Sequence, residues 1–363
     1  MKKLPLKSWI EAVHPYVPGK PISEVKRELG LKNVIKLASN ENPLGPSPKA
    51  LAAVRKALRE IHLYPDGGSF YLTDALARAL KAPKENLVIG NGSNEIIELL
   101  ARGFVSEGEE VLSSEGTFLV YPILSQVCGA RYVTAPMKNH GYDLARMAEK
   151  ITPRTRLIFI ANPNNPTGTY LSRVDVEAFL KKVPDDVLVC FDEAYFDFVE
   201  ARDFPDVQGM ILAERKNVCI LRTFSKAYGL AGLRIGYGIF HAETAGYLHK
   251  IRQPFNVNSL AQIAALASLK DKAFHKKTQK LVFAGRRFFY REFEKLGLPF
   301  VESQANFVLF DCSRDGETLF NAMLRKGVIV RSMKAYGFPT WIRVTIGLDA
   351  ENRKFFKCLK ECL

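Results

Sequence analysis

Between residues 86 and 222, short apolar runs rich in β-branched residues alternate with stretches whose apolar positions recur every three or four residues. Runs of the first kind predict buried strands, and stretches of the second kind predict helices. Strands that alternate with helices in this way are typical of an α/β fold whose sheet is mainly parallel. The strands that we predict here are 87–89, 110–112, 130–133, 156–160, 187–191 and 217–222.

Proline and glycine interrupt the first 45 residues or so repeatedly, as in the stretch 14–21. Only short elements fit between these interruptions, and helical spacing of the apolar residues returns after them. In this part of the chain we predict helices over 23–29, 48–61 and 70–80 and a strand over 34–37.

The pattern changes again beyond Asn256. A long helical stretch over about 258–296 is rich in lysine, arginine, phenylalanine and leucine, and short apolar strands follow it. This order indicates a smaller α+β domain after the α/β domain. We therefore predict an N-terminal arm over 1–40 that joins the small domain, a large α/β domain over 41–256 and a small α+β domain over 257–363.

The length and composition are those of an ordinary globular enzyme. A chain of 363 residues has room for two domains and a sizeable core, and 47% of its residues are hydrophobic and 25% charged. Its apolar runs are far shorter than the ~20 residues of a membrane span, and its start lacks the apolar segment of a signal peptide. The six cysteines form no Cys-x-x-Cys pair, so we expect free thiols in the reducing cytoplasm and no metal site.

The net charge of +14 is strongly basic. Such a charge suits nucleic-acid binding, but it equally attracts small anions. The basic residues are spread along the chain and form no long block, so the charge alone does not favour a nucleic-acid function. A phosphorylated cofactor and an anionic substrate would be sufficient reason for it.

The segment 223–237 carries the clearest candidate chemistry. Lys226 follows a predicted strand and lies among small, hydroxylated and glycine residues, with Arg234 eight positions later. A buried or charge-crowded lysine loses its proton and can form a Schiff base with an aldehyde, while Ser225 and Arg234 are residue types that bind phosphate. Together they indicate a site for pyridoxal phosphate. The alternative is a solvated surface lysine, since Ser-Lys dipeptides are common.

Residues 90–94, Gly-Asn-Gly-Ser-Asn, form a turn between a predicted strand and a predicted helix. The glycines allow a tight turn, and the free N–H groups at the start of the helix attract a phosphate. Ser93 and Asn94 would then be further donors to the phosphate. An ordinary turn in which Ser93 caps the helix explains the pattern equally well.

Two further polar motifs follow predicted strands. Asn165, in the Asn-Pro-Asn-Asn-Pro-Thr-Gly run, can contact the phenolic oxygen of the cofactor, although its neighbours also suit a plain turn. Asp192 can pair with a pyridinium nitrogen, which keeps the ring protonated and makes the cofactor an electron sink, or it can simply cap a helix. Tyr195, three residues later, can bond the same phenolic oxygen.

These motifs follow one another as Gly-Asn-Gly-Ser, Asn-Pro-Thr-Gly, Asp-x-x-Tyr and Ser-Lys with a later arginine, each at a strand end. In this arrangement the chain resembles the fold-type I, class II aminotransferases over nearly its whole length. The resemblance implies a large domain with a mainly parallel sheet, a smaller α+β domain, and pyridoxal 5'-phosphate bound covalently by Lys226. It also implies that the ring is held by Asp192, Tyr195 and Asn165, and the phosphate by Thr223, Ser225, Arg234, Ser93 and Asn94.

The resemblance gives roles to two aromatic residues as well. Phe118 matches an aromatic residue that stacks on the cofactor ring in this family, although a place in the core suits it almost equally. Tyr64 resembles a tyrosine that reaches into the neighbouring subunit's site to touch the phosphate. The resemblance therefore implies a homodimer with shared active sites.

Narrower features resemble one branch of the family. The segments 14–21, 37–48 and 64–67 are similar to those of aminotransferases that act on histidinol phosphate in histidine biosynthesis, with glutamate and 2-oxoglutarate as the other substrate pair. Arg343 matches the arginine that holds the anionic group of the substrate, and its planar fork suits a carboxylate. The other implied substrate contacts are Arg331, Tyr16 and Asn40, although Arg331 can equally be a surface arginine.

Other functions stay open at this point. Transamination of aromatic amino acids and decarboxylation of threonine phosphate would use the same cofactor motifs, and the sequence does not separate these substrates. A basic binding protein that keeps the fold is the alternative from another class. The chain has no separate helix-turn-helix segment, and its complete set of catalytic residue types argues for an enzyme.

Overall fold

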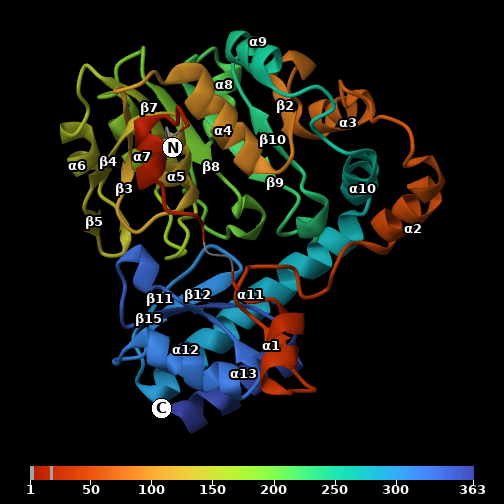
Figure 1. The fold of residues 1–363 in the computed structure, drawn as a ribbon, viewed down its shortest axis with the longest axis vertical. Helices are drawn as coiled ribbons and strands as arrows, with labels where there is room; N and C mark the ends of the chain where they lie inside the picture. The colour runs from red at the N-terminus through yellow and green to blue at the C-terminus, as the bar shows by residue number, and fades with distance from the viewer. Residues whose placement is uncertain (1–3, 17–18) are drawn as a thin grey trace.

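The computed structural model of the chain describes residues 4–16 and 19–363. Figure 1 shows two domains, one above the other, with a long helix running between them. The upper, larger domain contains the elements from α2 to α10, and the lower, smaller one contains the blue C-terminal elements. Among the described residues, no helix combines the length and the apolar character that a membrane crossing requires.

The large domain is built on a seven-stranded sheet in which six strands run parallel. The seventh strand, β10, is antiparallel to both of its neighbours, β2 and β9. The sequence pattern predicted the other six strands but not β10, because its Gly-Tyr-Gly-Ile sequence lacks a β-branched run. In spatial order the strands are β2 (Leu87–Gly90), β10 (Gly236–Ile239), β9 (Val218–Thr223), β8 (Leu188–Asp192), β7 (Thr155–Ala161), β3 (Glu110–Ser114) and β4 (Arg131–Ala135).

Helices cover both faces of this sheet, because successive residues of each buried strand point to opposite sides. On β8, for example, Val189 packs in one apolar cluster and Cys190 in the other. The Cys190 cluster includes residues of α4 (Ser93–Phe104), α5 (Val120–Val127) and α9 (Ala242–Ile251). The Val189 cluster includes residues of α2 (Pro48–Ala57), α3 (Phe70–Leu80), α6 (Leu144–Glu149), α7 (Arg173–Leu180), α8 (Val207–Leu212) and α10 (Ser259–Leu269).

The stretch predicted as one long helix over 258–296 consists of two helices, α10 and α11 (Lys272–Leu296). The break lies at Asp271, whose carboxylate accepts from the N–H of Phe274 and from Ser47 Oγ at 2.7 Å. A side chain that caps the new helix in this way stops the preceding one. α10 packs on α2 and contributes residues to the Val189 cluster on one face of the seven-stranded sheet.

The small domain is a four-stranded sheet covered by helices. Its core is rich in phenylalanine; Phe289 and Phe293 of α11 pack against Phe355 and Phe356 of α13. The strands, in spatial order, are β11 (Phe300–Val301), β12 (Phe307–Asp311), β15 (Trp341–Thr345) and β14 (Arg331–Ser332), and the other helices are α12 (Gly316–Arg325) and α13 (Asp349–Cys362).

The N-terminal arm contacts both domains. Its helix α1 (Ile22–Leu29) packs beside α12, and its strand β1 (Ile35–Lys36) pairs in parallel with β13 (Val328–Ile329). An earlier turn of 3-10 helix, Ser8–Ala12, lies instead on the large domain, where Trp9 Nε1 donates to the carbonyl of Val127 at the end of α5. In Figure 1 the red N-terminal segment accordingly begins on the upper domain and α1 lies on the lower one.

Candidate functional site

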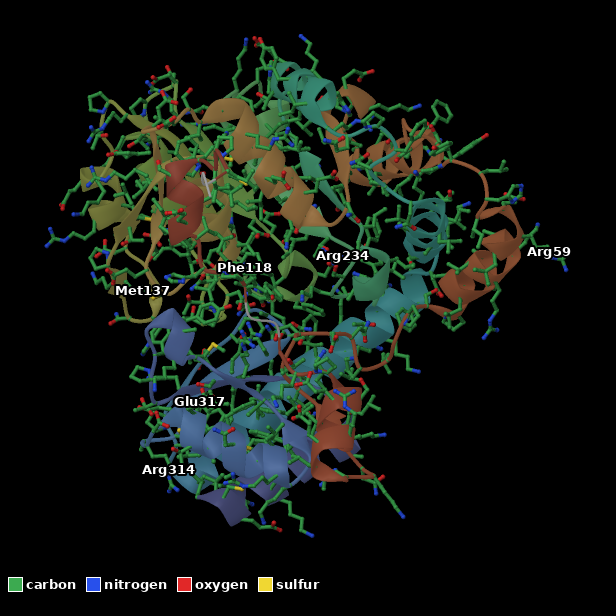
Figure 2. The ribbon with its side chains drawn as sticks, viewed as in Figure 1. Arg59, Phe118, Met137, Arg234, Arg314 and Glu317 are labelled. Atoms are coloured by element: carbon green, nitrogen blue, oxygen red, sulfur yellow. The ribbon has the colours of Figure 1, made fainter. Side chains whose placement is uncertain are left out.

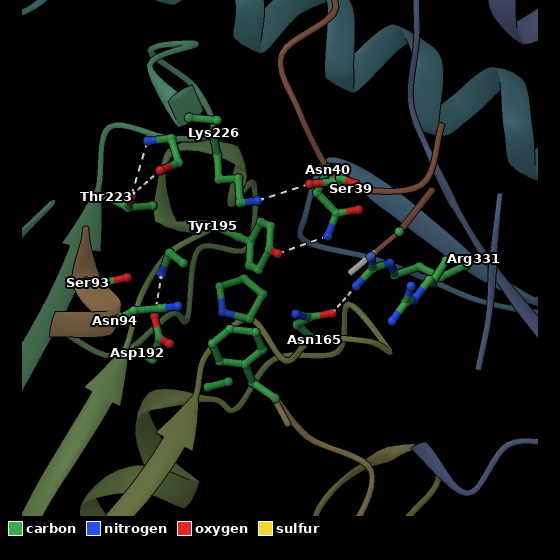
Figure 3. Close-up of a pocket in the computed structure, with 18 of the residues that line it drawn as sticks. Ser39, Asn40, Ser93, Asn94, Asn165, Asp192, Tyr195, Thr223, Lys226 and Arg331 are labelled. Atoms are coloured by element: carbon green, nitrogen blue, oxygen red, sulfur yellow. Dashed lines mark hydrogen bonds between the residues drawn. The ribbon is translucent and has the colours of Figure 1, made fainter. Parts of the chain in front are cut away.

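The carboxyl ends of β7, β8 and β9 open into a pocket of about 210 Å³ between the two domains. Open α/β sheets bind their ligands at this edge. Figure 2 shows Phe118 and Arg234 near the level where the domains meet, and Figure 3 shows the pocket in detail. The predicted site residues that line it are Tyr16, Asn40, Ser93, Asn94, Phe118, Asn165, Asp192, Tyr195, Thr223, Ser225, Lys226, Arg234, Arg331 and Arg343.

Lys226 reaches into the pocket from the loop that follows β9. Its Nζ donates a hydrogen bond to the carbonyl of Ser39 at 3.2 Å. Burial and the nearby positive charge of Arg343 together lower the pKa of Lys226 to about 8. A lysine with this pKa has an appreciable neutral fraction near neutral pH, so its amine can act as a nucleophile and as a base.

Asp192 is the last residue of β8 and lies at the floor of the pocket. Its carboxylate accepts hydrogen bonds from Tyr121 Oη at 2.8 Å and from the N–H of Ala194 at 3.1 Å. Burial raises the pKa of Asp192, and these two hydrogen bonds oppose the rise. A buried carboxylate in this setting suits a cationic partner inside the pocket.

Tyr121 is a site residue that the sequence analysis missed. It is fully buried in α5, stacks on Phe159 with ring centroids 4.6 Å apart, and lies one helical turn after Phe118. Only its spacing from Phe118 could have pointed to it, since its apolar neighbours give it the pattern of a core residue.

Gly92, Thr223, Ser225 and Arg234 form a polar cup at the start of α4. Gly92, at a φ of +75°, lets Arg234 approach so closely that a Cβ atom at this position would lie 2.5 Å from Nη2 of the guanidinium. Beside them, Thr223 Oγ1 is 3.0 Å from Ser225 Oγ and accepts from the N–H of Ser225 at 3.1 Å. A guanidinium, two hydroxyls and a helix N-terminus around one space are the donors that a phosphate requires.

The opposite wall of the pocket belongs to the small domain. The Arg343 guanidinium donates to Asn165 Oδ1 and to the carbonyl of Ala38, at 2.8 Å for the latter. Its Nε is buried and makes no hydrogen bond to any of the described residues. Arg331 lies directly opposite Arg343 in the β14–β15 ladder, so both side chains extend from the same face of this sheet.

Tyr336 lies on this wall too and was not predicted. Burial raises its pKa, Tyr16 raises it further, and Arg343 and Arg331 oppose the rise. These four residues therefore surround one part of the pocket. Tyr336 is the last residue of a short 3-10 helix, Lys334–Tyr336, after β14, where no periodic pattern marks a residue as part of a site.

The structure of one chain does not bring Tyr64 to the pocket. Its side chain is 83% exposed and stacks on Phe255, with ring centroids 4.8 Å apart. Other large apolar side chains are exposed in the same part of the chain, and Figure 2 shows Arg59 from this segment at the outer edge of the molecule. The exposed residues are Leu51, Leu58, Ile61, Leu63, Phe70 and Tyr71.

Several known proteins are similar to this chain. The pattern of the family described as aminotransferase class I and II matches residues 32–356. A histidinol-phosphate aminotransferase of Moorella thermoacetica is 51% identical to this chain over 354 residues, covering 98% of this chain and 92% of that protein. One from Anaeromyxobacter is 48% identical over 357 residues, covering 98% of both chains. The crystal structure of the Sinorhizobium meliloti histidinol-phosphate aminotransferase in complex with pyridoxal-5'-phosphate has a TM-score of 0.92 and 29% identity, covering 99% of this chain and 98% of that one.

Proposed function

The chain belongs to the class I and II aminotransferases, and from this premise we propose that it exchanges an amino group between histidinol phosphate and 2-oxoglutarate in histidine biosynthesis. The products would be imidazole acetol phosphate and glutamate. The observation that carries the proposal is the pair of facing arginines, Arg331 and Arg343, in the same pocket as the low-pKa lysine. The similarity to histidinol-phosphate aminotransferases at about half of all positions supports it.

Pyridoxal 5'-phosphate is the cofactor of this aminotransferase. When bound, it supplies an aldehyde for amines and a protonated ring that withdraws electrons from the substrate. The pocket fits this group, because the cup at Gly92 provides donors for a phosphate and Asp192 provides a buried carboxylate for a ring nitrogen. The residues that we propose to hold it are Lys226, Asp192, Tyr195, Asn165, Phe118, Thr223, Ser225, Arg234, Ser93 and Asn94.

Lys226 has two tasks in this proposal. Its amine would hold the aldehyde group of the cofactor while no substrate is bound, and it would be free once the amine of the substrate has taken its place. The free amine would then take a proton from the amine-bearing carbon of the substrate and pass it to the cofactor carbon on the other side of the shared nitrogen. A pKa of about 8 suits both directions of this transfer, since the amine gains and loses its proton close to neutral pH.

Asp192 and the arginines provide the electrostatic part of catalysis. The Asp192 carboxylate, fixed by Tyr121 and Ala194, would keep the proton on the ring nitrogen and so stabilise negative charge that develops on the substrate. Arg343 and Arg331 would bind the far end of each substrate. Histidinol phosphate presents a phosphate and 2-oxoglutarate presents carboxylates, so one pair of arginines has to bind both anions in turn.

A substrate comparison tests this function. Purified protein with bound cofactor is mixed separately with histidinol phosphate, phenylalanine and threonine phosphate, and its visible absorbance is recorded. We expect histidinol phosphate at micromolar concentration to change the spectrum and 2-oxoglutarate to restore it. A stronger response to phenylalanine would indicate an aromatic aminotransferase, and release of carbon dioxide from threonine phosphate would indicate a decarboxylase.

We propose in addition that the enzyme is a homodimer whose partner subunit supplies Tyr64. The support is the exposed apolar segment over 51–71, since an apolar patch of this kind marks a protein interface. Dimerisation through this segment would bury it and place the Tyr64 hydroxyl at the phosphate of the other subunit. All six cysteines are free thiols, which supports a reducing compartment, and we place the enzyme in the cytoplasm.

A further inference from the structure

Asn40 has an unusual backbone at the wall of the pocket. Asn40 is only 1% exposed, and its backbone φ of +56° lies in the left-handed region that residues with a Cβ seldom adopt. Such a conformation persists only where the surroundings hold it, and it is often found at functional sites.

The small domain holds Asn40 by three hydrogen bonds. The N–H of Asn40 donates to Thr345 Oγ1 at 2.9 Å, and Thr345 Oγ1 donates to Asn40 Oδ1 at 3.0 Å. The carbonyl of Asn40 accepts from Asn306 Nδ2 at 3.1 Å. Thr345 is the last residue of β15 and Asn306 directly precedes β12, so both partners belong to the small-domain sheet.

These bonds fix the direction in which the protons point. A threonine hydroxyl has a single proton, and the N–H of Asn40 can only donate to it. Thr345 donates this proton to Asn40 Oδ1, and the NH₂ group of the amide faces Tyr195 Oη, 2.9 Å away. Tyr195 accepts this hydrogen bond, so its own hydroxyl proton is free to be donated elsewhere. Figure 3 shows Asn40 and Tyr195 joined in this way.

We propose that Asn40 is a positioning residue that directs the Tyr195 hydroxyl proton towards the phenolic oxygen of the cofactor, and that Thr345 of the small domain sets its orientation. This inference rests on the proposed function only in that it assumes the cofactor of the family. It adds a role to the substrate contact that the resemblance implied, because Tyr195 and Thr345 engage one hydrogen of the amide NH₂ group and the amide oxygen.

The state of Tyr195 supports this role. Burial raises the pKa of Tyr195 to about 12, while Arg343 and the hydrogen bond from Asn40 counteract the rise. The hydroxyl therefore keeps its proton at neutral pH and has it available to donate. A hydroxyl that accepts one hydrogen bond also becomes a stronger donor in the next, since the bonds in a chain polarise one another.

The arrangement also ties the cofactor pocket to the position of the small domain. Thr345 and Asn306 can hold Asn40 only while the small-domain sheet lies against it, as it does here. Movement of that sheet away from the pocket would release the amide, and Tyr195 could then donate to Asn40 instead. The donor that faces the cofactor would thus be in place only when the domains are together.

The test is a spectroscopic pH titration of the protein with its lysine-bound cofactor, without any substrate. A proton donated to the phenolic oxygen stabilises negative charge there, so the neighbouring nitrogen attracts its own proton less strongly. Loss of the donor should raise the pH midpoint of the visible absorbance change. We expect Tyr195→Phe and Asn40→Asp to raise the midpoint by about one pH unit or more, since one pH unit corresponds to the free energy of one ordinary hydrogen bond.

Thr345 provides the matched pair of variants. Thr345→Val removes the hydroxyl at nearly constant volume. The side-chain amide of Asn40 can then adopt either of its two flipped orientations, so the midpoint should rise by a smaller amount. Thr345→Ser keeps the hydroxyl and should restore the midpoint of the unmodified protein. This difference separates orientation from packing, and it can be measured even if Asn40→Asp does not fold.

Two outcomes would overturn the proposal. One is a midpoint that moves in Tyr195→Phe but stays unchanged in Asn40→Asp or, where that variant does not fold, in Thr345→Val. The other is a midpoint that Thr345→Ser raises as much as Thr345→Val does. Failure of the proposed substrate is seen separately, because the titration involves no histidinol phosphate and an inactive protein would still show the midpoint shifts.

Discussion

Arg331 and Arg343 face each other directly across the β14–β15 ladder, and both line the pocket. Like charges opposite each other on neighbouring strands destabilise a sheet by a few tenths to about 1 kcal/mol. An anionic ligand between the two side chains would turn this repulsion into binding. The facing pair is therefore the best physical argument for a substrate that carries an anionic group.

The first prediction concerns Arg331→Gln. This change removes one charge-assisted hydrogen bond to the phosphate of histidinol phosphate, which is worth about 1.5–3 kcal/mol. We expect kcat/KM for histidinol phosphate to fall roughly 10- to 100-fold, with a smaller effect on the half-reaction with 2-oxoglutarate, for which we propose Arg343 as the main anchor. Equal losses for both substrates in single-turnover kinetics would contradict this division between the arginines.

A second prediction uses the pKa of Lys226. Only the neutral amine attacks the aldehyde, and the pKa of this lysine is lowered from 10.5 to about 8. The rate at which apoprotein captures pyridoxal phosphate should therefore rise with pH and level off above about 8. The rise can be followed by stopped-flow absorbance. A profile that keeps rising towards pH 10 would show an ordinary, unperturbed lysine.

Arg343→Gln should shift that profile to higher pH, because the positive charge of Arg343 contributes to the low pKa of Lys226. Arg331→Gln is the matched control. Arg331 lies on the same wall but is not among the largest causes of this low pKa, so the pH profile of Arg331→Gln should stay closer to that of the unmodified protein. Equal shifts in the two variants would show a general loss of structure in the pocket.

A third prediction concerns Lys226→Ala. Loss of the nucleophile should abolish covalent attachment of the cofactor, and loss of the proton carrier should lower the rate of transamination by about a thousandfold or more. Borohydride reduction followed by mass spectrometry should locate the cofactor on Lys226 in the unmodified protein and nowhere in the variant. The exposed Lys138 on β5 (Met137–Lys138) serves as a control, and Lys138→Ala should keep full activity. Turnover that persists in Lys226→Ala would exclude this lysine as the catalytic base.

The fourth prediction addresses the exposed apolar segment. Leu58 and Ile61 are 49% and 64% exposed, and a charge at each would be costly inside an interface. The double substitution Leu58→Asp with Ile61→Asp should convert a dimer into monomers in sedimentation velocity. Val174 on α7 is 73% exposed and lies outside this segment, so Val174→Asp should remain dimeric. A monomeric unmodified protein would refute the proposed dimer.

A fifth prediction asks whether Tyr64 works in the site of the other subunit. Lys226→Ala and Tyr64→Ala are purified separately, then mixed, exchanged and assayed at limiting cofactor. In each mixed dimer one site would have both lost residues restored and the other site neither, so activity should return. No recovery in a mixture that demonstrably contains mixed dimers would place Tyr64 outside the shared site.

The sequence was most informative where a functional residue follows a buried strand. Asp192, Lys226 and Asn165 come after apolar runs that could be recognised, and parallel strands bring their carboxyl ends to one edge of the sheet. The residues of the large-domain half of the pocket could therefore be grouped before any geometry was known. The mainly parallel sheet and its helices followed from the same alternation of patterns.

Other parts of the pocket depend on contacts that no local pattern records. Tyr336 reaches the pocket only because the small-domain sheet packs where it does, and Tyr121 is hidden among the apolar residues of α5. The role proposed for Asn40 depends on Thr345, which is 305 residues away in the chain. β10 was missed because Gly236, which makes room for α4, and Gly238 remove the strand pattern: a Cβ on Gly236 would lie 2.6 Å from the backbone nitrogen of Ser93.

Because the N-terminal arm is attached to both domains, it forms a connecting segment that tethers one to the other. Trp9 is anchored on the large domain and α1 on the small one, and the chain between these anchors can span at most about 45 Å even when fully extended. Opening of the domains is therefore bounded by chain length as well as by surface contacts. Tyr16 and Gly19 belong to this connecting segment and line the pocket. Residues of the segment that limits domain opening therefore also form part of the wall against which a substrate must fit.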